Sequence, residues 1–141
     1  MALRCDSSPE FKENDRVVSY VWHLPEVQPG TMASVVSPYH GSLYAAQLPN
    51  GELHRWFAGF ELQPINTSLE YYNLMQPGSL AKVIETNGHP PNIKVGTIVR
   101  IIQSLESVPF YDLILDGKGY HRWLAEFEIA PMSAFAQAYT G

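Results

Sequence analysis

The sequence predicts an all-β protein made of two tandem, five-stranded small barrels, each with a short 3₁₀ turn before its last strand. Three observations predict this fold class: a long internal repeat, strand-like segments separated by turn residues, and the lack of any segment of ten or more residues with helical periodicity. Eleven prolines and ten glycines interrupt the 141-residue chain. Such frequent interruption is typical of many short strands joined by turns.

The repeat is clearest at residues 54–64, HRWFAGFELQP, and 121–131, HRWLAEFEIAP, which are identical at seven of eleven positions. Upstream, a Gly-Thr step at Gly30 recurs at Gly96, followed each time by apolar residues. The same order of elements around both copies indicates that a whole structural unit was duplicated. The boundaries that follow are a flexible N-terminus at 1–10, barrel 1 at 11–65, a linker at 66–73, barrel 2 at 74–132 and a tail at 133–141.

Each copy contains the same elements in order. A first strand rich in β-branched residues precedes a Pro-rich loop, and a glycine opens the second strand, where it permits a tight entry. The third strand leads into Asn-Gly or Asp-Gly, a strong hairpin signal, and the HRW segment is the returning strand. The Ala-x-Phe segment suits one 3₁₀ turn before a short last strand. The first three strands are expected at 15–21, 30–36 and 42–48 in copy 1, and at 80–84, 96–102 and 110–115 in copy 2.

These elements resemble a known group of folds. A strand carrying Trp56 or Trp123, followed by Ala-x-Phe-Glu-Leu/Ile-x-Pro, is similar to the end of SH3-like barrels, and the Gly-opened second strand resembles KOW and Tudor-type barrels. The resemblance implies the fold and does not specify a function, because such barrels host many unrelated ones. Both the Ala-Leu-Tyr-Asp-Tyr strand and the tryptophan pair of peptide-binding SH3 domains are missing, so no peptide-binding residues are carried over.

Composition limits the classes of function. A formal charge of −5, with nine scattered basic residues, argues against direct nucleic-acid binding, which needs clustered Lys and Arg. The single cysteine, Cys5, permits no internal disulfide, which favours a reducing compartment. No signal-peptide pattern and no run of ~20 apolar residues occurs, so we expect a soluble cytoplasmic protein with no membrane contact.

Enzyme chemistry and a bound cofactor find little support in the sequence. It contains no nucleophile elbow, phosphate loop or paired carboxylates with suitable spacing, and no short His/Cys spacing of a zinc site. A cluster of His23, His40 and a glutamate is the one conceivable metal site. We expect no catalytic residues, no cofactor and no metal.

The repeated HRW strand is predicted to be structural. Strand alternation places His54 and Trp56 on one face and Arg55 and Phe57 on the other, so only one of these faces should be core. Alternation alone leaves open which face this is; we expect the tryptophans to seal each barrel or the contact between the barrels. Arg55 and Glu61, like their counterparts in copy 2, are expected to pair and lock the 3₁₀ turn to the strand.

Loop aromatic residues are the best candidates for function, because Tyr and Trp on loops are enriched at protein interfaces. Trp22, which has no aromatic counterpart in copy 2, and Tyr39 are predicted to contact a protein or peptide partner, with Tyr20 and Tyr44 beside them. The sequence leaves two alternatives open. One is an acidic regulator that mimics nucleic acid and blocks a DNA- or RNA-binding protein; the other is a small-molecule binder or enzyme in a groove between the barrels.

Overall fold

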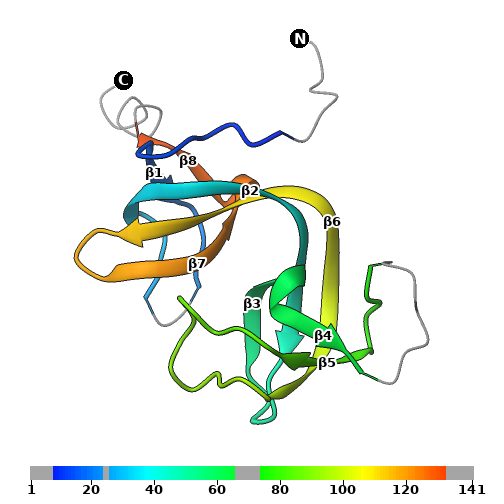
Figure 1. Cartoon of the computed structure of the whole chain (residues 1–141). Helices are drawn as coiled ribbons and strands as arrows, with labels where there is room; N and C mark the ends of the chain where they lie inside the picture. Colours follow the sequence, from blue (N-terminus) through cyan, green and yellow to red (C-terminus); the bar gives the residue numbers. More distant parts are fainter. Residues whose placement is uncertain (1–7, 24–25, 66–73, 133–141) are drawn as a thin grey trace. The chain divides into compact units, whose positions relative to one another are not determined.

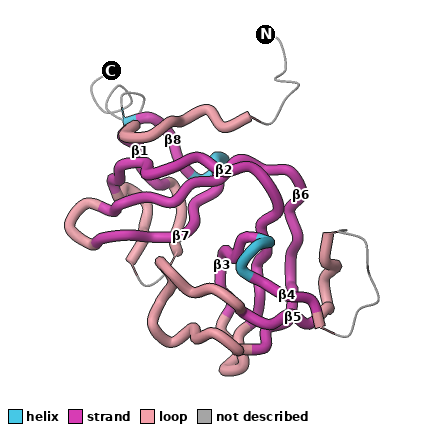
Figure 2. The backbone as a smooth tube through the Cα atoms, viewed as in Figure 1, coloured by secondary structure: helices cyan, strands magenta, loops and turns pink. Residues whose placement is uncertain are grey.

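The computed structural model describes residues 8–23, 26–65 and 74–132, which form β-strands and two 3₁₀ turns (Figures 1 and 2). The all-β prediction is confirmed, and each repeat has a 3₁₀ turn before its last strand. No helix in these ranges is long and apolar enough to cross a membrane. The elements are β1 (Arg16–Ser19), β2 (Met32–Gln47), β3 (Leu53–Ala58), η1 (Gly59–Glu61), β4 (Leu62–Pro64), β5 (Leu80–Val83), β6 (Ile98–Leu115), β7 (Gly119–Ala125), η2 (Glu126–Glu128) and β8 (Ile129–Pro131).

Several expectations fall on residues outside the described part of the chain. These are Cys5 with most of the N-terminal segment, the linker at 66–73 and the tail at 133–141.

All eight labelled strands belong to one antiparallel sheet with the order β4-β5-β6-β2-β1-β8, while β3 pairs with β2 and β7 with β6. The strands that begin one repeat pair with the strands that end the other. In β1, Val17 faces Pro131 of β8, and in β4, Leu62 faces Val83 of β5. Each of these ladders therefore joins one half of the sequence to the other.

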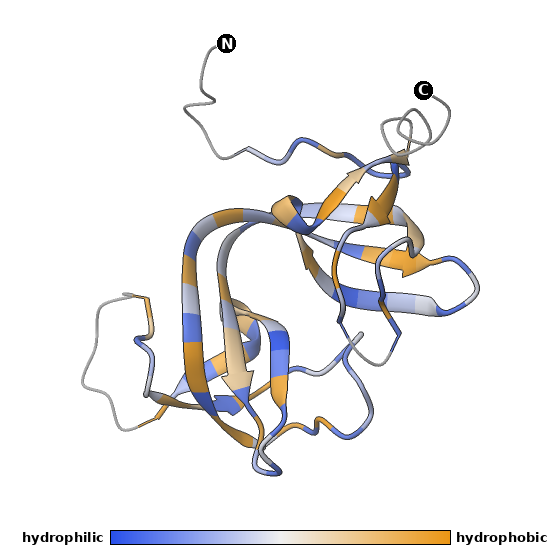
Figure 3. Ribbon diagram, turned by 180° about the vertical axis from the view of Figure 1, so that it is seen from behind, coloured by the Kyte–Doolittle hydropathy of each residue, from blue (hydrophilic) through white to orange (hydrophobic). Residues whose placement is uncertain are grey.

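Two strands are much longer than the sequence indicates. The expected second and third strands of each copy are continuous, as β2 in copy 1 and β6 in copy 2 (Figure 1). Residues 37–41, expected as the loop that carries Tyr39, are therefore strand. Because β2 and β6 are hydrogen-bonded neighbours in the sheet, the backbone here can continue as a paired strand without a turn. Hydrophobic and hydrophilic bands follow one another along β6 (Figure 3), and its buried residues lie toward its two ends.

The continuous strands change the domain boundaries. The chain forms two compact units: unit 1 contains Met1–His40 and Val108–Gly141, and unit 2 contains Gly41–Ser107. The expected division into barrels at 11–65 and 74–132 does not match these units. Each unit takes one half of each repeat, because β2 and β6 each pass from one unit to the other.

Each unit has its own hydrophobic core, and the two cores are built alike. The N–H of Phe11 donates to the Tyr111 hydroxyl at 3.1 Å in unit 1, and the N–H of Met75 donates to the Tyr44 hydroxyl at 3.1 Å in unit 2. Repeat-equivalent residues thus perform equivalent packing roles. The unit 1 core contains Phe11, Val17, Val27, Ala33, Val35, Tyr111, Leu113, Leu115, Leu124 and Ile129; the unit 2 core contains Tyr44, Ala46, Leu48, Phe57, Leu62, Met75, Ala81, Val83, Ile93, Val99 and Ile101.

The tryptophans of the repeated motif are buried, as predicted, but strand alternation does not explain how. Tyr44 faces Phe57 while the next residue of β2 faces Arg55, so Trp56 is an extra residue in a β-bulge. The bulge lets Trp56 and Phe57 both be buried, at 2% and 0% exposure. Trp123 lies at the same irregularity in copy 2, and the peptide bond before each tryptophan is cis.

Candidate functional site

Two of the predicted contact residues, Tyr20 and Trp22, are exposed just after β1 in unit 1. Their exposed fractions are 58% and 61%. Val21 between them packs against the unit 1 core. Tyr20 and Trp22, on either side of Val21, are therefore large aromatic residues that remain accessible beside the core. We call these two residues the aromatic pair.

The backbone at the N-terminal end of the aromatic pair is fixed by hydrogen bonds. The N–H of Tyr20 donates to the carbonyl of Glu128 at 2.9 Å. The hydroxyl of Ser19 contacts both the N–H and the carbonyl oxygen of Val21 at 3.0 Å. The segment that carries the aromatic pair is therefore attached to the end of η2.

The backbone that follows Trp22 is fixed by an isolated β-bridge. The N–H of His23 donates to the carbonyl of Val27 at 2.9 Å, and the N–H of Val27 donates back at 3.0 Å. Trp22 thus lies between two anchored points. A partner would not need to order this backbone on binding, which reduces the entropic cost of association.

The other two predicted contact residues are placed differently. Tyr39 lies on β2 and is half-buried; its ring stacks on Phe110 at a centroid distance of 5.5 Å and meets Trp123 edge-on at 4.8 Å. Tyr44 is 3% exposed, and its hydroxyl accepts the N–H of Met75, so it is a core residue of unit 2. Its neighbours Leu43, Ala45 and Ala46 are buried as well, so Tyr44 forms no part of an accessible surface.

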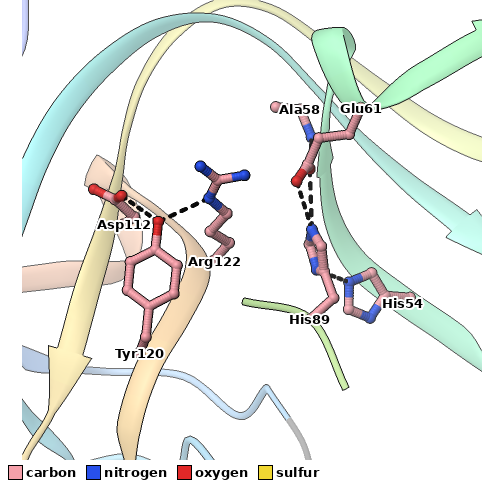
Figure 4. A network of polar contacts seen from close by, with 7 residues as sticks. All are labelled: His54, Ala58, Glu61, His89, Asp112, Tyr120 and Arg122. Carbon is pink, nitrogen blue, oxygen red and sulfur yellow. Dashed lines mark hydrogen bonds and ion pairs between the residues drawn. The ribbon is translucent and has the colours of Figure 1, made fainter. Parts of the chain in front are cut away.

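A buried polar cluster in unit 2 was not predicted. The carboxylate of Glu61 accepts the N–H of Ala58 at 2.9 Å, which caps η1, and lies 2.9 and 3.0 Å from Nε2 of His89 (Figure 4). Nδ1 of His89 is 3.1 Å from Nε2 of His54. The side chains of Glu61 and His89 are completely buried. A buried carboxylate needs such partners, since burial of an unpaired charge is costly.

Unit 1 contains the equivalent pair. Oε2 of Glu128 lies 2.7 Å from Nε2 of His23, and Oε1 accepts the N–H of Ala125 at 2.8 Å. The second histidine differs: Nδ1 of His121 lies 2.7 Å from Glu26, and its Nε2 has no hydrogen-bond partner in the described part of the chain. This hydrogen bond to His121 lowers the pKa of Glu26. The Glu–His pair is therefore the element that both units share.

Both Glu–His pairs join the two repeats. In each unit the histidine comes from the Pro-rich loop of one repeat and the glutamate from the 3₁₀ turn of the other. The sequence contains a signal for these pairs, because His23 and His89 lie at the Pro-rich loop in both copies. A role shared by both units indicates that the pairs maintain the fold.

The structure gives no support to the metal site considered from the sequence. His23 is buried beside Glu128, whereas His40 is exposed on β2. Among the described residues, no group of three or more His, Cys, Asp or Glu side chains is arranged to hold a metal ion.

A second polar network occurs in unit 1. The Tyr120 hydroxyl donates to Asp112 at 2.5 Å and accepts from Nε of Arg122 at 2.8 Å (Figure 4). Asp112 also accepts the backbone N–H of Ser37 at 2.9 Å, and the Arg122 guanidinium lies 4.7 Å from the centroid of the Trp123 ring. Burial, with the hydrogen bond to Asp112 as the second cause, raises the pKa of Tyr120 to about 12.

This network is specific to unit 1. The strand register places Ala45 and Leu53 of copy 1 at the positions of Asp112 and Tyr120, so unit 2 has no equivalent. The network links Tyr120 of β7 to Ser37 of β2 through the Asp112 carboxylate of β6.

The comparisons with known proteins identify the fold. No protein-family model matches the sequence, and no curated protein matches it. The crystal structure of a DUF1541 family protein, ydhK, from Bacillus subtilis superimposes with a TM-score of 0.63 at 19% identity, covering 89% of this chain and 87% of that one.

Two further structures of the same protein agree with this result. A second crystal structure of ydhK gives a TM-score of 0.59 at 20% identity, covering 84% of this chain and 98% of that one. The solution structure of the ydhK C-terminal domain gives 0.61 at 20% identity, covering 86% and 93%. At these identities the likeness concerns the fold alone: this chain has an all-β fold similar to that of ydhK.

Proposed function

We propose that this chain is a non-enzymatic protein- or peptide-binding module in which each compact unit is an SH3-like barrel. Its contact surface is the aromatic pair, Tyr20 and Trp22. The observation that carries the proposal is the exposure of two large aromatic side chains, 58% and 61%, on a backbone anchored on both sides. Aromatic residues of this kind supply most of the binding energy at many interfaces.

The difference between the units supports the same assignment. Tyr20 and Ile84 occupy equivalent positions, because their N–H groups donate to the carbonyls of the equivalent residues Glu128 and Glu61. Copy 2 has no aromatic residue between Ile84 and His89. Features needed for the fold should occur in both units, whereas a binding surface can be confined to one.

The SH3-like assignment of each unit is supported by the order of its elements. A strand, a long loop, a Gly-opened strand, a hairpin, a 3₁₀ turn and a last strand are all present, although each unit takes them from both repeats. We also propose the cytoplasm as the location, based on the sequence's single cysteine.

The test is capture of partners from the source organism by the tagged chain, comparing wild type with Trp22→Ala and Tyr20→Ala. Ile114→Ala is the matched control, because Ile114 is a 50% exposed hydrophobic residue of the same unit. A partner retained by the control and lost by both aromatic variants supports the proposal.

Two results contradict it. A partner that all three variants retain, with affinity that falls steeply as salt rises, indicates an acidic surface that mimics nucleic acid. Loss of the partner by the Ile114 control to the same extent indicates a general change of structure.

A further inference from the structure

The hairpin turns of the two units are fastened to their sheets in different ways. In unit 1 the N–H of Asp116 donates to the carbonyl of Met32 at 2.9 Å. The Asp116 carboxylate accepts two hydrogen bonds from the Arg16 guanidinium, at 2.8 and 2.5 Å, and Arg16 also donates to Ser34 at 2.9 Å. A backbone bond and a bidentate ion pair therefore hold this turn against β1 and β2.

Pro49 takes the place of Asp116 in unit 2. The register follows from the hydrogen bond that closes each turn, Gly51 N–H to Leu48 O at 2.8 Å in unit 2 and Lys118 N–H to Leu115 O at 3.1 Å in unit 1. Proline has neither an N–H group nor a carboxylate. The unit 2 turn therefore cannot form either of the two fastenings.

The cation is still present in unit 2, on the neighbouring strand. Arg16 faces Ser34 across β1 and β2, and at the equivalent positions Leu80 faces Arg100 across β5 and β6. Arg100 is exposed and donates to the carbonyl of Gly78 at 3.1 Å. No carboxylate in the described part of the chain pairs with it.

A hollow of about 290 Å³ lies between the unfastened turn and the strands. Leu48, Pro49, Leu80 and Ile98 form its apolar lining, and Arg100 supplies a cation to it. In unit 1 the corresponding place holds the carboxylate of Asp116. The comparison with unit 1 thus indicates that this hollow of unit 2 accepts a carboxylate.

We propose that this hollow binds the carboxyl terminus of a peptide whose last side chain is aliphatic. The terminal carboxylate pairs with Arg100, as Asp116 pairs with Arg16 in unit 1, because a guanidinium matches a carboxylate in a bidentate geometry. The aliphatic side chain fills the apolar part of the hollow. This site is in unit 2 and does not depend on the aromatic pair.

The experiment is a titration of the ¹⁵N-labelled full chain with N-acetyl-Gly-Leu, followed by the backbone amide signals. We expect a dissociation constant on the order of 1 mM, as suits so small a ligand, with shifts at Gly51, Ile98 and Arg100. The C-terminal amide of the same peptide should bind at least ~10-fold more weakly, since it has no charged group for the guanidinium.

Three variants make the test specific. Arg100→Gln should weaken binding at least ~10-fold, whereas Lys82→Gln, which removes a neighbouring exposed cation opposite Ile98, should leave it unchanged. Pro49→Asp introduces a carboxylate into the hollow and should also abolish binding. Well-dispersed spectra show that each variant is folded.

Several outcomes would overturn the proposal: equal affinity of acid and amide, full binding by Arg100→Gln, or shifts confined to other residues. A further probe, 4-methylpentanoate, separates the two sources of an aliphatic carboxylate. If it binds more tightly than the peptide, the ligand is a small free acid and the assignment to a peptide terminus is wrong.

Discussion

Replacement of His89 by alanine should strongly destabilise unit 2. Nε2 of His89 lies 2.9 Å from the carboxylate of Glu61, which is completely buried and also accepts the N–H of Ala58. Removal of one partner of a buried hydrogen-bonded pair costs about 1–3 kcal/mol or more, because a buried polar group loses a partner that water cannot replace. With a urea m-value of about 1–3 kcal/mol per molar, a loss of ~3 kcal/mol lowers the unfolding midpoint by roughly 1–3 M.

A double-mutant cycle separates the pair from general disruption. Glu61→Ala should destabilise at least as much as His89→Ala, because it also removes the cap of η1. The double variant should be more stable than the sum of the single changes predicts, with a coupling of at least about 1 kcal/mol.

The assay is urea unfolding followed by circular dichroism and tryptophan fluorescence. Lys12→Ala is the control, because its contact with Asp15 at 3.4 Å is on the surface and the midpoint should not change. If His89→Ala unfolds at the wild-type midpoint, or if the two single changes are additive, the Glu61–His89 pair does not stabilise the unit.

The remaining predictions concern ionisation in unit 1. Asp112→Asn should lower the pKa of Tyr120 from about 12, because it removes a hydrogen-bonded negative charge that favours the neutral phenol. Ultraviolet titration measures this pKa, and the Tyr120→Phe variant identifies the signal that belongs to Tyr120. The hydrogen bond to His121 is the main cause of the lowered pKa of Glu26. Glu26 should therefore stabilise the folded state at pH values above its ordinary pKa of 4.5, and this stabilisation is lost as the pH falls through the lowered pKa. Glu26→Gln should therefore flatten the fall in unfolding midpoint below pH 4.5, and an unchanged acid profile would contradict this.

The sequence predicts the order of elements well, because turn and strand signals are local. The Asn50-Gly51 hairpin and the 3₁₀ turn before β4 are both present where residue patterns place them. The path of the chain between units was not predicted. Pro38 and Gly41 are typical of a loop, yet both lie within β2, because pairing with a strand more than fifty residues away determines their conformation.

The candidate surface could be predicted only in part for the same reason. Trp22 and Tyr20 lie at the end of a predicted strand, just before a Pro-rich loop, and both are exposed, as a contact surface requires. Tyr44 was assigned to the surface, although its strand faces a core partly supplied by the second repeat. The Glu61–His89 pair likewise joins distant segments, and no local pattern reports such a contact.

The central claim is that each compact unit contains half of each repeat. A protease site inserted into segment 66–73 and cut in the folded protein tests it directly, with size-exclusion chromatography before and after addition of urea. We predict that the cut fragments elute together at the size of the intact chain until urea separates them, because β1 pairs with β8 and β4 with β5 across the cut. Elution of two separate folded fragments from the native cut protein would contradict the claim and restore the division at 11–65 and 74–132.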